Sequence, residues 1–377
     1  MPTPSNRRAS SSGQQRWASV GRVNTTLVIG AGLIGASIGQ RLRATDTEVF
    51  LEDAEHAHAV VAASRGAGIV AKPRPDIVKL VVVATPPSAV ADTVVDALHR
   101  YPNAAVTDVA SVKSSVEAAV LGGCAKAGRQ DEAARYVGSH PMAGSHRAGP
   151  LTASPDLFVD RTWVLVNRAG QVEWAVAIVV DLIEICGARL VELDAQTHDR
   201  AVAAVSHLPQ IMASLTAARL CDVDPADLAL AGQGVRDVTR VAASDVALWR
   251  QIVAANRTAV QAQLEAVRDD LCNLIDHLGE PEAVEDVLAR GRAGVDALPG
   301  KHGRARSELV AVVVQIPDTP GALAKLFADI EGLGVNVEDL SIEHDAIREV
   351  GFLSLQVAPE RAQTLADALR ADNWVVR

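Results

Sequence analysis

A chain of 377 residues is long enough to form two or three domains, each with its own hydrophobic core. Its formal net charge of −10 argues against general binding to nucleic acids or to acidic membrane surfaces, because neither attracts an acidic protein. The four cysteines are far apart and form no Cys-x-x-Cys pair, so we expect no metal site and no disulfide framework. This cysteine usage fits a reducing cytoplasm.

Residues 1–22 are rich in serine and arginine and contain no acidic residue. This composition is shared with transit peptides, and Arg7-Arg8 is similar to part of an export signal, but no apolar segment follows it. We interpret the segment as a disordered tail. No apolar run is expected to be long enough to span a membrane, since the run 80–84 has the length of a strand and is closed by Pro86-Pro87.

The first predicted element is a strand at residues 25–29, which leads into a glycine-rich turn and then a helix. In dinucleotide-binding folds the first glycine permits the turn, the second lets a pyrophosphate approach, and the third lets helix and strand pack closely. The phosphates lie at the helix N-terminus, where free N–H groups favour negative charge. The predicted cofactor-binding residues of the turn are Gly30, Gly32, Leu33, Ile34 and Gly35.

A second predicted strand, residues 48–51, is followed by Glu52-Asp53. An acid at this place accepts hydrogen bonds from the adenosine ribose and repels a 2′-phosphate, so Asp53 predicts NAD rather than NADP. Further apolar strands at 77–84, 104–108 and 162–166 predict a Rossmann-like, doubly wound parallel sheet. Ligands bind beyond the carboxyl ends of such strands, which adds Thr85 and Pro86 to the cofactor site.

We divide the chain into a tail (1–22), the NAD-binding domain (23–168), an all-helical substrate and dimerisation domain (169–298), a basic linker (299–307) and a C-terminal domain (308–377). One predicted helix ends at Gly187, and Asp194 and Asp245 are predicted N-caps of two others. The last region has the strand–helix–strand–strand–helix–strand order of a small α+β, ferredoxin-like domain.

The longest predicted helix, capped by Asp245, carries apolar residues at spacings of 4, 3, 4, 3 and 4. They are Val260, Leu264, Val267, Leu271, Leu274 and Leu278. This seam covers about two and a half heptads, too few for a free-standing coiled coil. Packing within one subunit and packing across a homodimer interface both remain open.

Four short sequence motifs, in a fixed order, are more specific than the order of strands and helices. They are residues 108–113 (DVASVK), 139–144 (SHPMAG), 206–209 (SHLP) and 237–240 (DVTR), with Trp249 after the last. Behind the glycine motif this set resembles the prephenate/arogenate dehydrogenase family of tyrosine biosynthesis, over residues 25–278. The segment 309–377, with Asp318-Thr319-Pro320-Gly321, resembles an ACT domain, a module that commonly binds amino acids. The fusion implies feedback control by an aromatic amino acid.

The family passes hydride from a hydroxycyclohexadiene acid to NAD, with loss of carbon dioxide and aromatisation of the ring. The resemblance implies that His140 is the catalytic base, because a near-neutral base must take the hydroxyl proton as hydride departs. Ser111 matches the serine that hydrogen-bonds in the same site and can orient the imidazole. Lys113 is a further candidate for contact with substrate or cofactor.

Three more residues match substrate contacts of the family. Arg240 matches an arginine that binds a substrate carboxylate through its planar fork. His207 matches a substrate-contacting histidine, and Trp249 a residue of the pocket edge that can come from the neighbouring subunit. His198 is expected to lie outside the site, because nine residues of a regular helix rotate it by about 180° from His207.

Some positions depart from the family pattern. His146 stands where many relatives have an acid, and Arg236 where they have a lysine; the glycine run reads Gly232-Gln233-Gly234. These changes bear on pH dependence and on the choice between prephenate and arogenate.

The sequence therefore predicts NAD-dependent oxidative decarboxylation of prephenate to 4-hydroxyphenylpyruvate by a cytoplasmic homodimer. One alternative is preference for arogenate, which gives tyrosine directly. Another is a sensor that binds NAD and an amino acid without turnover. The sensor hypothesis predicts loss of His140, Ser111 and Arg240, and all three are present.

Overall fold

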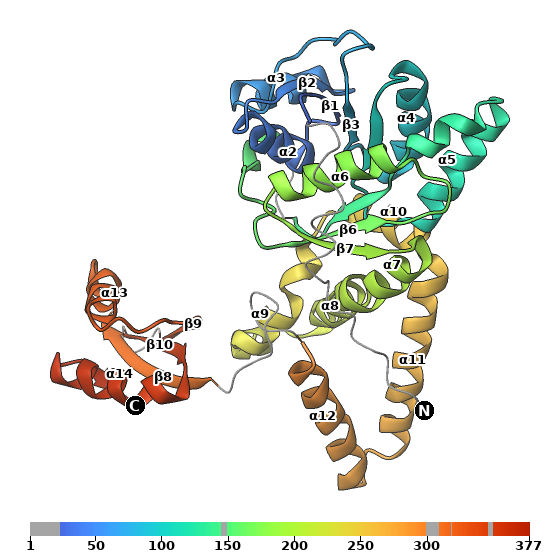
Figure 1. The fold of residues 1–377 in the computed structure, drawn as a ribbon. Coiled ribbons are helices and arrows are strands. Elements are labelled where there is room, and N and C mark those ends of the chain that lie inside the picture. The colour runs from blue at the N-terminus through green and yellow to red at the C-terminus, as the bar shows by residue number, and fades with distance from the viewer. Residues whose placement is uncertain (1–22, 145–148, 299–308, 318, 346–349) are drawn as a thin grey trace. The chain divides into compact units, whose positions relative to one another are not determined.

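The computed structural model describes residues 23–144, 149–298, 309–317, 319–345 and 350–377. The predicted tail, the linker and His146 lie outside these residues. The chain divides into two compact units, the first ending at Leu271 and the second beginning at Cys272 (Figure 1).

The first unit begins with a four-stranded parallel sheet in the order β2-β1-β3-β4. Its strands are β1 (Thr25–Ile29), β2 (Glu48–Glu52), β3 (Leu80–Val83) and β4 (Ala105–Asp108). The helices that follow them are α2 (Leu33–Arg43), α3 (His56–Ser64), α4 (Pro87–Arg100) and α5 (Ser114–Lys126). Separate apolar cores fill the two faces, one containing residues of α2 and α3 and the other residues of α4 and α5. The predicted doubly wound sheet is confirmed with these four strands, whereas the strand predicted at 162–166 belongs to a second sheet.

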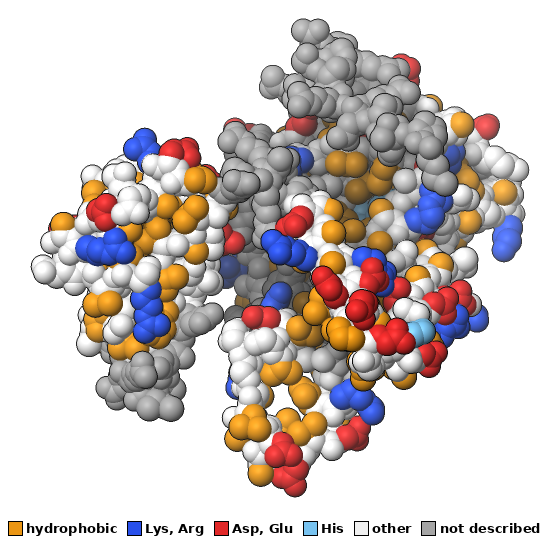
Figure 2. All heavy atoms as spheres, turned by 90° about the horizontal axis from the view of Figure 1, so that it is seen from below, with side chains coloured by type: hydrophobic (Ala, Val, Ile, Leu, Met, Phe, Trp, Pro, Cys, Tyr) orange, Lys and Arg blue, Asp and Glu red, His pale blue; other side chains and the backbone are white. Residues whose placement is uncertain are grey.

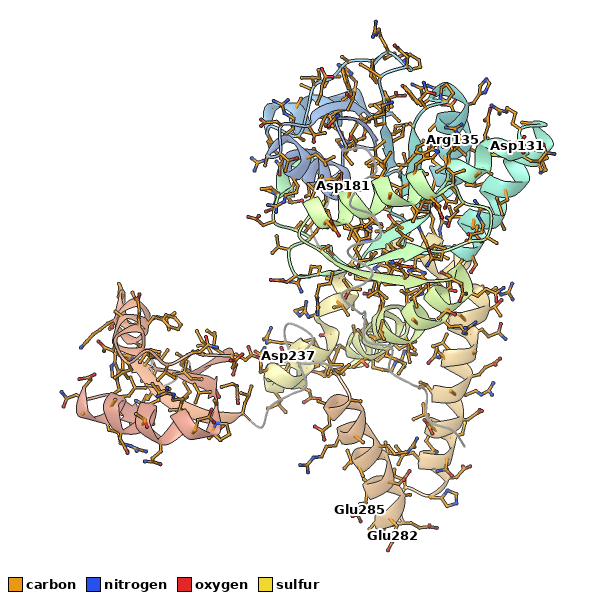
Figure 3. All side chains as sticks on the ribbon, viewed as in Figure 1. Asp131, Arg135, Asp181, Asp237, Glu282 and Glu285 are labelled. Carbon is orange, nitrogen blue, oxygen red and sulfur yellow. The ribbon has the colours of Figure 1, made fainter. Side chains whose placement is uncertain are left out.

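A second sheet continues the fold, with β5 (Ser139–Pro141) antiparallel to β6 (Thr162–Val166) and β6 parallel to β7 (Arg189–Leu193). Two short 3₁₀ turns, Gln130–Arg135 and Pro150–Thr152, flank β5. The side chain of Arg135, labelled in Figure 3, donates to the carbonyls of Leu98, Tyr101 and Ala104 at 2.6, 2.8 and 3.0 Å. These bonds satisfy carbonyls at the end of α4 and in the turn that follows it.

Strand β7 corrects the expectation that residues 169–298 are all helical. The strand lies at the end of its sheet and none of its residues is fully buried, so it lacks the apolar pattern by which buried strands are predicted. Helix α6 (Glu173–Ile185) precedes it and packs into the core of the first sheet, while Gly187, at φ +68°, turns the chain back toward β7.

A helical region follows. It contains α7 (Ala195–Val202), a π-helical turn (Ala203–His207), α8 (Leu208–Arg219), α9 (Gln233–Thr239), α10 (Val246–Ala255) and α11 (Arg257–Asp276). Short 3₁₀ turns occupy Leu220–Asp222, Asp227–Leu230 and Arg240–Ala243. Both predicted N-caps are confirmed, because Asp194 and Asp245 each accept from a backbone N–H three residues on, at 2.8 Å.

The predicted long helix is two helices. Asn256, at φ −108° and ψ 29°, ends α10 before α11 begins, so Asp245 caps the shorter one. The Asn256 amide donates to the carbonyl of Asp199 at 2.8 Å, a tertiary contact that sequence periodicity does not reveal. The apolar seam is buried at Val260, but Leu271 and Leu278 are exposed, and Leu278 lies beyond the helix end.

The helical region differs from the expectation that no apolar run is long enough to span a membrane. Joined by the π-turn, residues 195–222 form a helix of 28 residues that is long and apolar enough to cross a membrane by length and composition alone. The stretch also contains buried His198, Asp199 and His207, whose hydrogen bonds run to β5, α5 and Asn256. Those bonds are what a helix of a folded domain makes.

The second unit contains α12 (Pro281–Asp296) and an antiparallel sheet in the order β11-β8-β10-β9. In chain order its elements are β8 (Val310–Pro317), α13 (Ala322–Gly332), β9 (Asp339–Asp345), β10 (Val350–Val357), α14 (Pro359–Ala371) and β11 (Val375–Val376). Alternate residues of β8 and β10 are buried in a core with residues of α13 and α14. The predicted small α+β domain is confirmed as a fold.

Gly35 in α2 provides a test of the packing at the glycine turn. A Cβ at this position would lie 1.9 Å from the Gly30 carbonyl oxygen. Because that oxygen belongs to the backbone, relieving the clash would require a costly backbone shift. We expect Gly35→Ala to lower the free energy of unfolding by about 1–3 kcal/mol or more. Gly122→Ala in α5, where a Cβ meets nothing within 4 Å, is the matched control and should be neutral or stabilising. Equal stability in urea would refute the packing argument.

Candidate active site

The glycine turn has the geometry that a bound dinucleotide requires. Gly30 has φ +99°, and a Cβ there would lie 2.4 Å from the Ala84 carbonyl oxygen, so only glycine fits. A Cβ on Gly32 would meet nothing within 4 Å, which leaves an open face at the start of α2. Leu33 and Ile34 form the half-exposed first turn of that helix. The arrangement leaves room and N–H donors for phosphate.

The acidic residue beside this turn is Asp53. Its carboxylate accepts from the backbone N–H of Ala31 at 2.6 Å and of Glu55 at 2.8 Å, which holds it next to the glycines. The neighbouring Glu52 is paired with Arg100 at 2.9 Å, so Asp53 is the acid that remains for a ribose. Thr85, after β3, has a buried hydroxyl without a partner among the described residues, and Pro86 precedes α4. Such an unsatisfied group suits a ligand contact.

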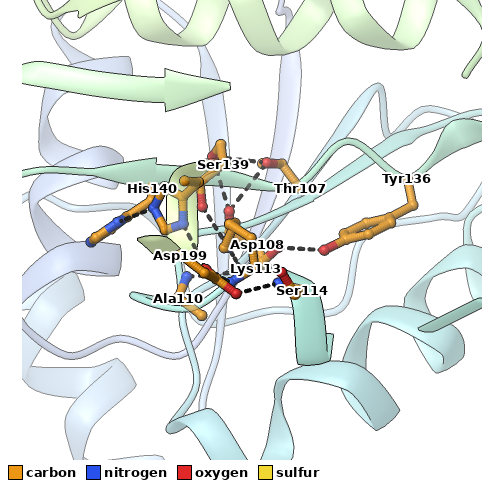
Figure 4. Close-up of polar contacts among 10 residues, drawn as sticks. Thr107, Asp108, Ala110, Lys113, Ser114, Tyr136, Ser139, His140 and Asp199 are labelled. Carbon is orange, nitrogen blue, oxygen red and sulfur yellow. Dashed lines mark hydrogen bonds and ion pairs between the residues drawn. The ribbon is translucent and has the colours of Figure 1, made fainter. Parts of the chain in front are cut away.

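A buried ion pair occupies the end of β4 (Figure 4). Lys113 pairs with Asp108 and donates to the Ser139 carbonyl at 2.7 Å, while the Tyr136 hydroxyl donates to Asp108 at 2.7 Å. Burial lowers the pKa of Lys113, an effect that the Asp108 carboxylate opposes. Lys113 was predicted as a candidate for contact with substrate or cofactor; its side chain is 1% exposed and ties the 108–113 loop to β5.

His140 lies on β5 directly after Ser139, at the edge of the site. It is buried, and its Nδ1 is 2.9 Å from Nε2 of His198. Nδ1 of His198 is in turn 2.8 Å from Oδ1 of Asp199, so three side chains form one hydrogen-bonded chain. Burial, and then the nearby charges of His198, Lys113 and His207, hold the pKa of His140 well below its usual range. At neutral pH His140 is therefore an uncharged base.

The expectation that His198 lies outside the site is wrong. It assumed a regular helix, but residues 203–207 form a π-turn, which rotates less per residue than an α-helix. Pro209 explains the turn, because it lacks an N–H and its ring would clash with the carbonyl of Val205 in an unbroken helix. Hydrogen bonds through Asp199 and Asn256 then link His198 and His207 in one cluster.

His207 is almost fully buried between α8 and α10. Its Nδ1 is 3.2 Å from the Asn256 amide nitrogen, and the Trp249 ring packs edge-on against it at 5.8 Å between ring centroids. Trp249 makes this contact within its own chain. Burial lowers the pKa of His207 to about 4, with the Asp199 carboxylate opposing the shift.

Ser111 and Arg240 are less constrained. Ser111 is half-buried on the loop after β4, and its hydroxyl makes no hydrogen bond to His140; His198 orients the imidazole instead. Arg240 is exposed at the start of a 3₁₀ turn, and its guanidinium has no partner among the described residues. That turn packs on α8, where Gln210 donates to the Val241 carbonyl at 2.9 Å one helical turn beyond His207.

Sequence reasoning missed His198, Asp199 and Asn256 as members of the site. The adjacent histidine and acid, shortly after the cap at Asp194, were a usable signal. Asn256 carried no signal, because its contacts join residues 49 and 57 positions apart.

The ion pair at Lys113 makes a stability prediction. Lys113→Met leaves the Asp108 carboxylate buried without its cation and should cost about 3–5 kcal/mol in the free energy of unfolding. Lys126→Met, at the exposed end of the same helix, is the control and should change stability little. Unchanged stability of Lys113→Met together with a raised KM for substrate would contradict the structural role and support contact of Lys113 with substrate.

Comparisons with known proteins agree with this geometry. Residues 38–192 match the family model "prephenate dehydrogenase, nucleotide-binding domain", and residues 194–289 match "prephenate dehydrogenase, dimerization domain". The probable prephenate dehydrogenase NovF of Streptomyces niveus is 34% identical over 366 residues, covering 93% of this chain and 99% of that protein. Prephenate dehydrogenase of Lactococcus lactis is 25% identical over 357 residues, covering 91% and 95%.

Among solved structures, arogenate dehydrogenase from Synechocystis is 25% identical, with a TM-score of 0.60, and the match covers 72% of this chain and 99% of that one. The glycine turn, the buried histidines and these matches lead to one conclusion. The chain belongs to the prephenate dehydrogenase family.

Proposed function

We propose that the protein catalyses the NAD-dependent oxidative decarboxylation of prephenate to 4-hydroxyphenylpyruvate. The observation that carries the proposal is His140, a buried and uncharged base beside the carboxyl edge of a sheet whose glycine turn suits a dinucleotide. NAD, when bound, supplies the hydride acceptor. The residues that we assign to NAD binding are Gly30, Gly32, Leu33, Ile34, Gly35, Asp53, Thr85 and Pro86.

His140 provides the proton transfer that this reaction needs. As hydride leaves the ring carbon that bears the hydroxyl, His140 takes the hydroxyl proton through Nε2. The carboxylate on the ring then leaves as carbon dioxide, and its bonding electrons make the ring a phenolate. His140 returns the proton to that oxygen, so no net proton is consumed. Aromatisation drives this second step, and no other base is needed.

The remaining polar groups suit a dianionic substrate. The guanidinium of Arg240 has no partner in the described part of the chain and is assigned to a carboxylate, for which its planar fork is well matched. His207 and the Trp249 ring against it are assigned to substrate contact, and Ser111 to a hydrogen bond in the same site. Preference for arogenate is the alternative, supported by the likeness to the Synechocystis arogenate dehydrogenase.

We further propose that the protein is a cytoplasmic homodimer. The match to a dimerization domain supports association through the helical region. A groove of about 410 Å³ runs along α10 and α11, lined by Val253, Val260 and Leu264 with charged residues at its rim. Apolar side chains also reach the surface among charged ones in Figure 2. Such an exposed apolar surface suits a second copy of the chain.

The first test is NADH formation from NAD with prephenate and with arogenate in parallel. We expect turnover of prephenate with the higher kcat/KM, and His140→Asn should lower kcat by about 10²–10⁴-fold with little change in KM. Because the pKa of His140 lies well below 6.5, kcat/KM should persist below that pH and fall only when His140 becomes protonated. Absence of turnover with either substrate, in protein that binds NAD, would reject the proposal.

The C-terminal α+β domain is proposed to bind an aromatic amino acid and regulate the enzyme. Its fold and the Thr319-Pro320-Gly321 turn support this assignment. Deleting residues 309–377 should leave turnover intact and abolish the response to tyrosine or another aromatic amino acid. Equal responses of the full and shortened chains would disprove the regulatory role.

A further inference from the structure

Asp199 has a larger set of partners than one cap or one ion pair would need. Its carboxylate accepts from the backbone N–H groups of Lys113 and Ser114, each at 2.8 Å, and from the His198 ring (Figure 4). Its backbone carbonyl accepts from Asn256. Burial opposes its ionisation, but these hydrogen bonds outweigh burial and lower the pKa of Asp199. The group is a carboxylate and can only accept hydrogen bonds.

That constraint fixes the protons along the first branch of the cluster. Because Asp199 only accepts, Nδ1 of His198 must carry the proton. A His198 ring that carries this one proton has a lone pair on Nε2 and accepts there from Nδ1 of His140. His140 therefore holds its proton on Nδ1 and presents a free lone pair on Nε2.

The second branch starts at the carbonyl of the same residue. A carbonyl also only accepts, so the atom of Asn256 that faces it is the amide nitrogen. This nitrogen lies 3.2 Å from Nδ1 of His207, which must accept from it. His207 is uncharged at neutral pH, and its proton is therefore on Nε2.

We propose that Asp199 is a positioning residue that gives the two buried histidines opposite tautomers, His140 as a hydrogen-bond acceptor and His207 as a donor at Nε2. The proposal deepens the proposed function, on which its chemical meaning rests. The lone pair on Nε2 of His140 can accept the proton that the substrate hydroxyl must lose. The Nε2–H group of His207 can donate to an anionic oxygen of the substrate, and the uncharged ring adds no buried positive charge beside His140.

The direct test is nitrogen NMR of the full-length protein with ¹⁵N-labelled histidine rings, without substrate. Signals are assigned with His140→Asn and His207→Gln. We expect a protonated Nδ1 and bare Nε2 in His140, and the reverse in His207. The opposite tautomer in either ring of the wild-type protein would overturn the proposal.

Variants separate this role from simple structural support. Asp199→Asn should mix the tautomers of His140 through His198 but leave those of His207 unchanged, because the backbone carbonyl that holds Asn256 is retained. Asp194→Asn, at the cap of the same helix, should leave both rings unchanged. Asn256→Leu should mix the tautomers of His207 alone, and His198→Phe should mix those of His140 alone. These two variants test the proposal even if Asp199→Asn fails to fold. Pure tautomers in folded His198→Phe and Asn256→Leu would show that the network does not set them.

Kinetics give an independent readout. His198→Phe should lower kcat about tenfold or more, while Asn256→Leu should mainly raise KM, because the two rings serve proton transfer and substrate binding respectively. His198→Gln, which offers an amide oxygen as acceptor, should recover part of the lost kcat. A uniform loss in both variants would contradict the division of roles. If prephenate is not turned over but the tautomers are as assigned, only the proposed function fails.

Discussion

The site depends on the hydrogen bonds of one buried carboxylate, Asp199. Asp199 lies on α7 and hydrogen-bonds to the start of α5 and to the junction of α10 and α11. Through His198 it is also linked to the histidine on β5. Hydrogen bonds to a charged group contribute about 1.5–3 kcal/mol each, and leaving such a group unpaired in the interior costs more. The cluster therefore has one favourable arrangement, and that arrangement determines what each histidine can do.

A second buried charge sets the electrostatics around this network. The cation of Lys113 is held by Asp108 beneath β5 and disfavours a proton on His140. Desolvation acts in the same direction on His140 and His207. Two histidines can thus be buried near each other without charge repulsion, and the exposed Arg240 is the cation that we propose for an anionic substrate.

Sequence patterns predicted those features that are local. The glycine turn, the acid at Asp53 and the caps at Asp194 and Asp245 each depend on residues within a few positions, and the order of strands and helices follows from apolar periodicity. The errors arose where distant contacts override local pattern. The break between α10 and α11 at Asn256 depends on a partner 57 positions away.

The π-turn shows the limit of periodicity most clearly. A rotation of 100° per residue separates His198 from His207, yet a single wide turn before Pro209 was enough to invalidate that count. A residue that contacts His140 was excluded by an argument that is sound for a regular helix. Irregular turns of this kind are frequent at functional sites, where side chains must point away from the helical repeat.

The most direct test of the account is a crystal structure of the protein with NAD and 4-hydroxyphenylpyruvate. We predict that Nε2 of His140 lies about 2.6–3.2 Å from the phenolic oxygen and that the guanidinium of Arg240 and Nε2 of His207 contact oxygens of the side-chain keto acid. A product bound with its phenolic oxygen away from His140 would contradict the assignment of the base and, with it, the central claim.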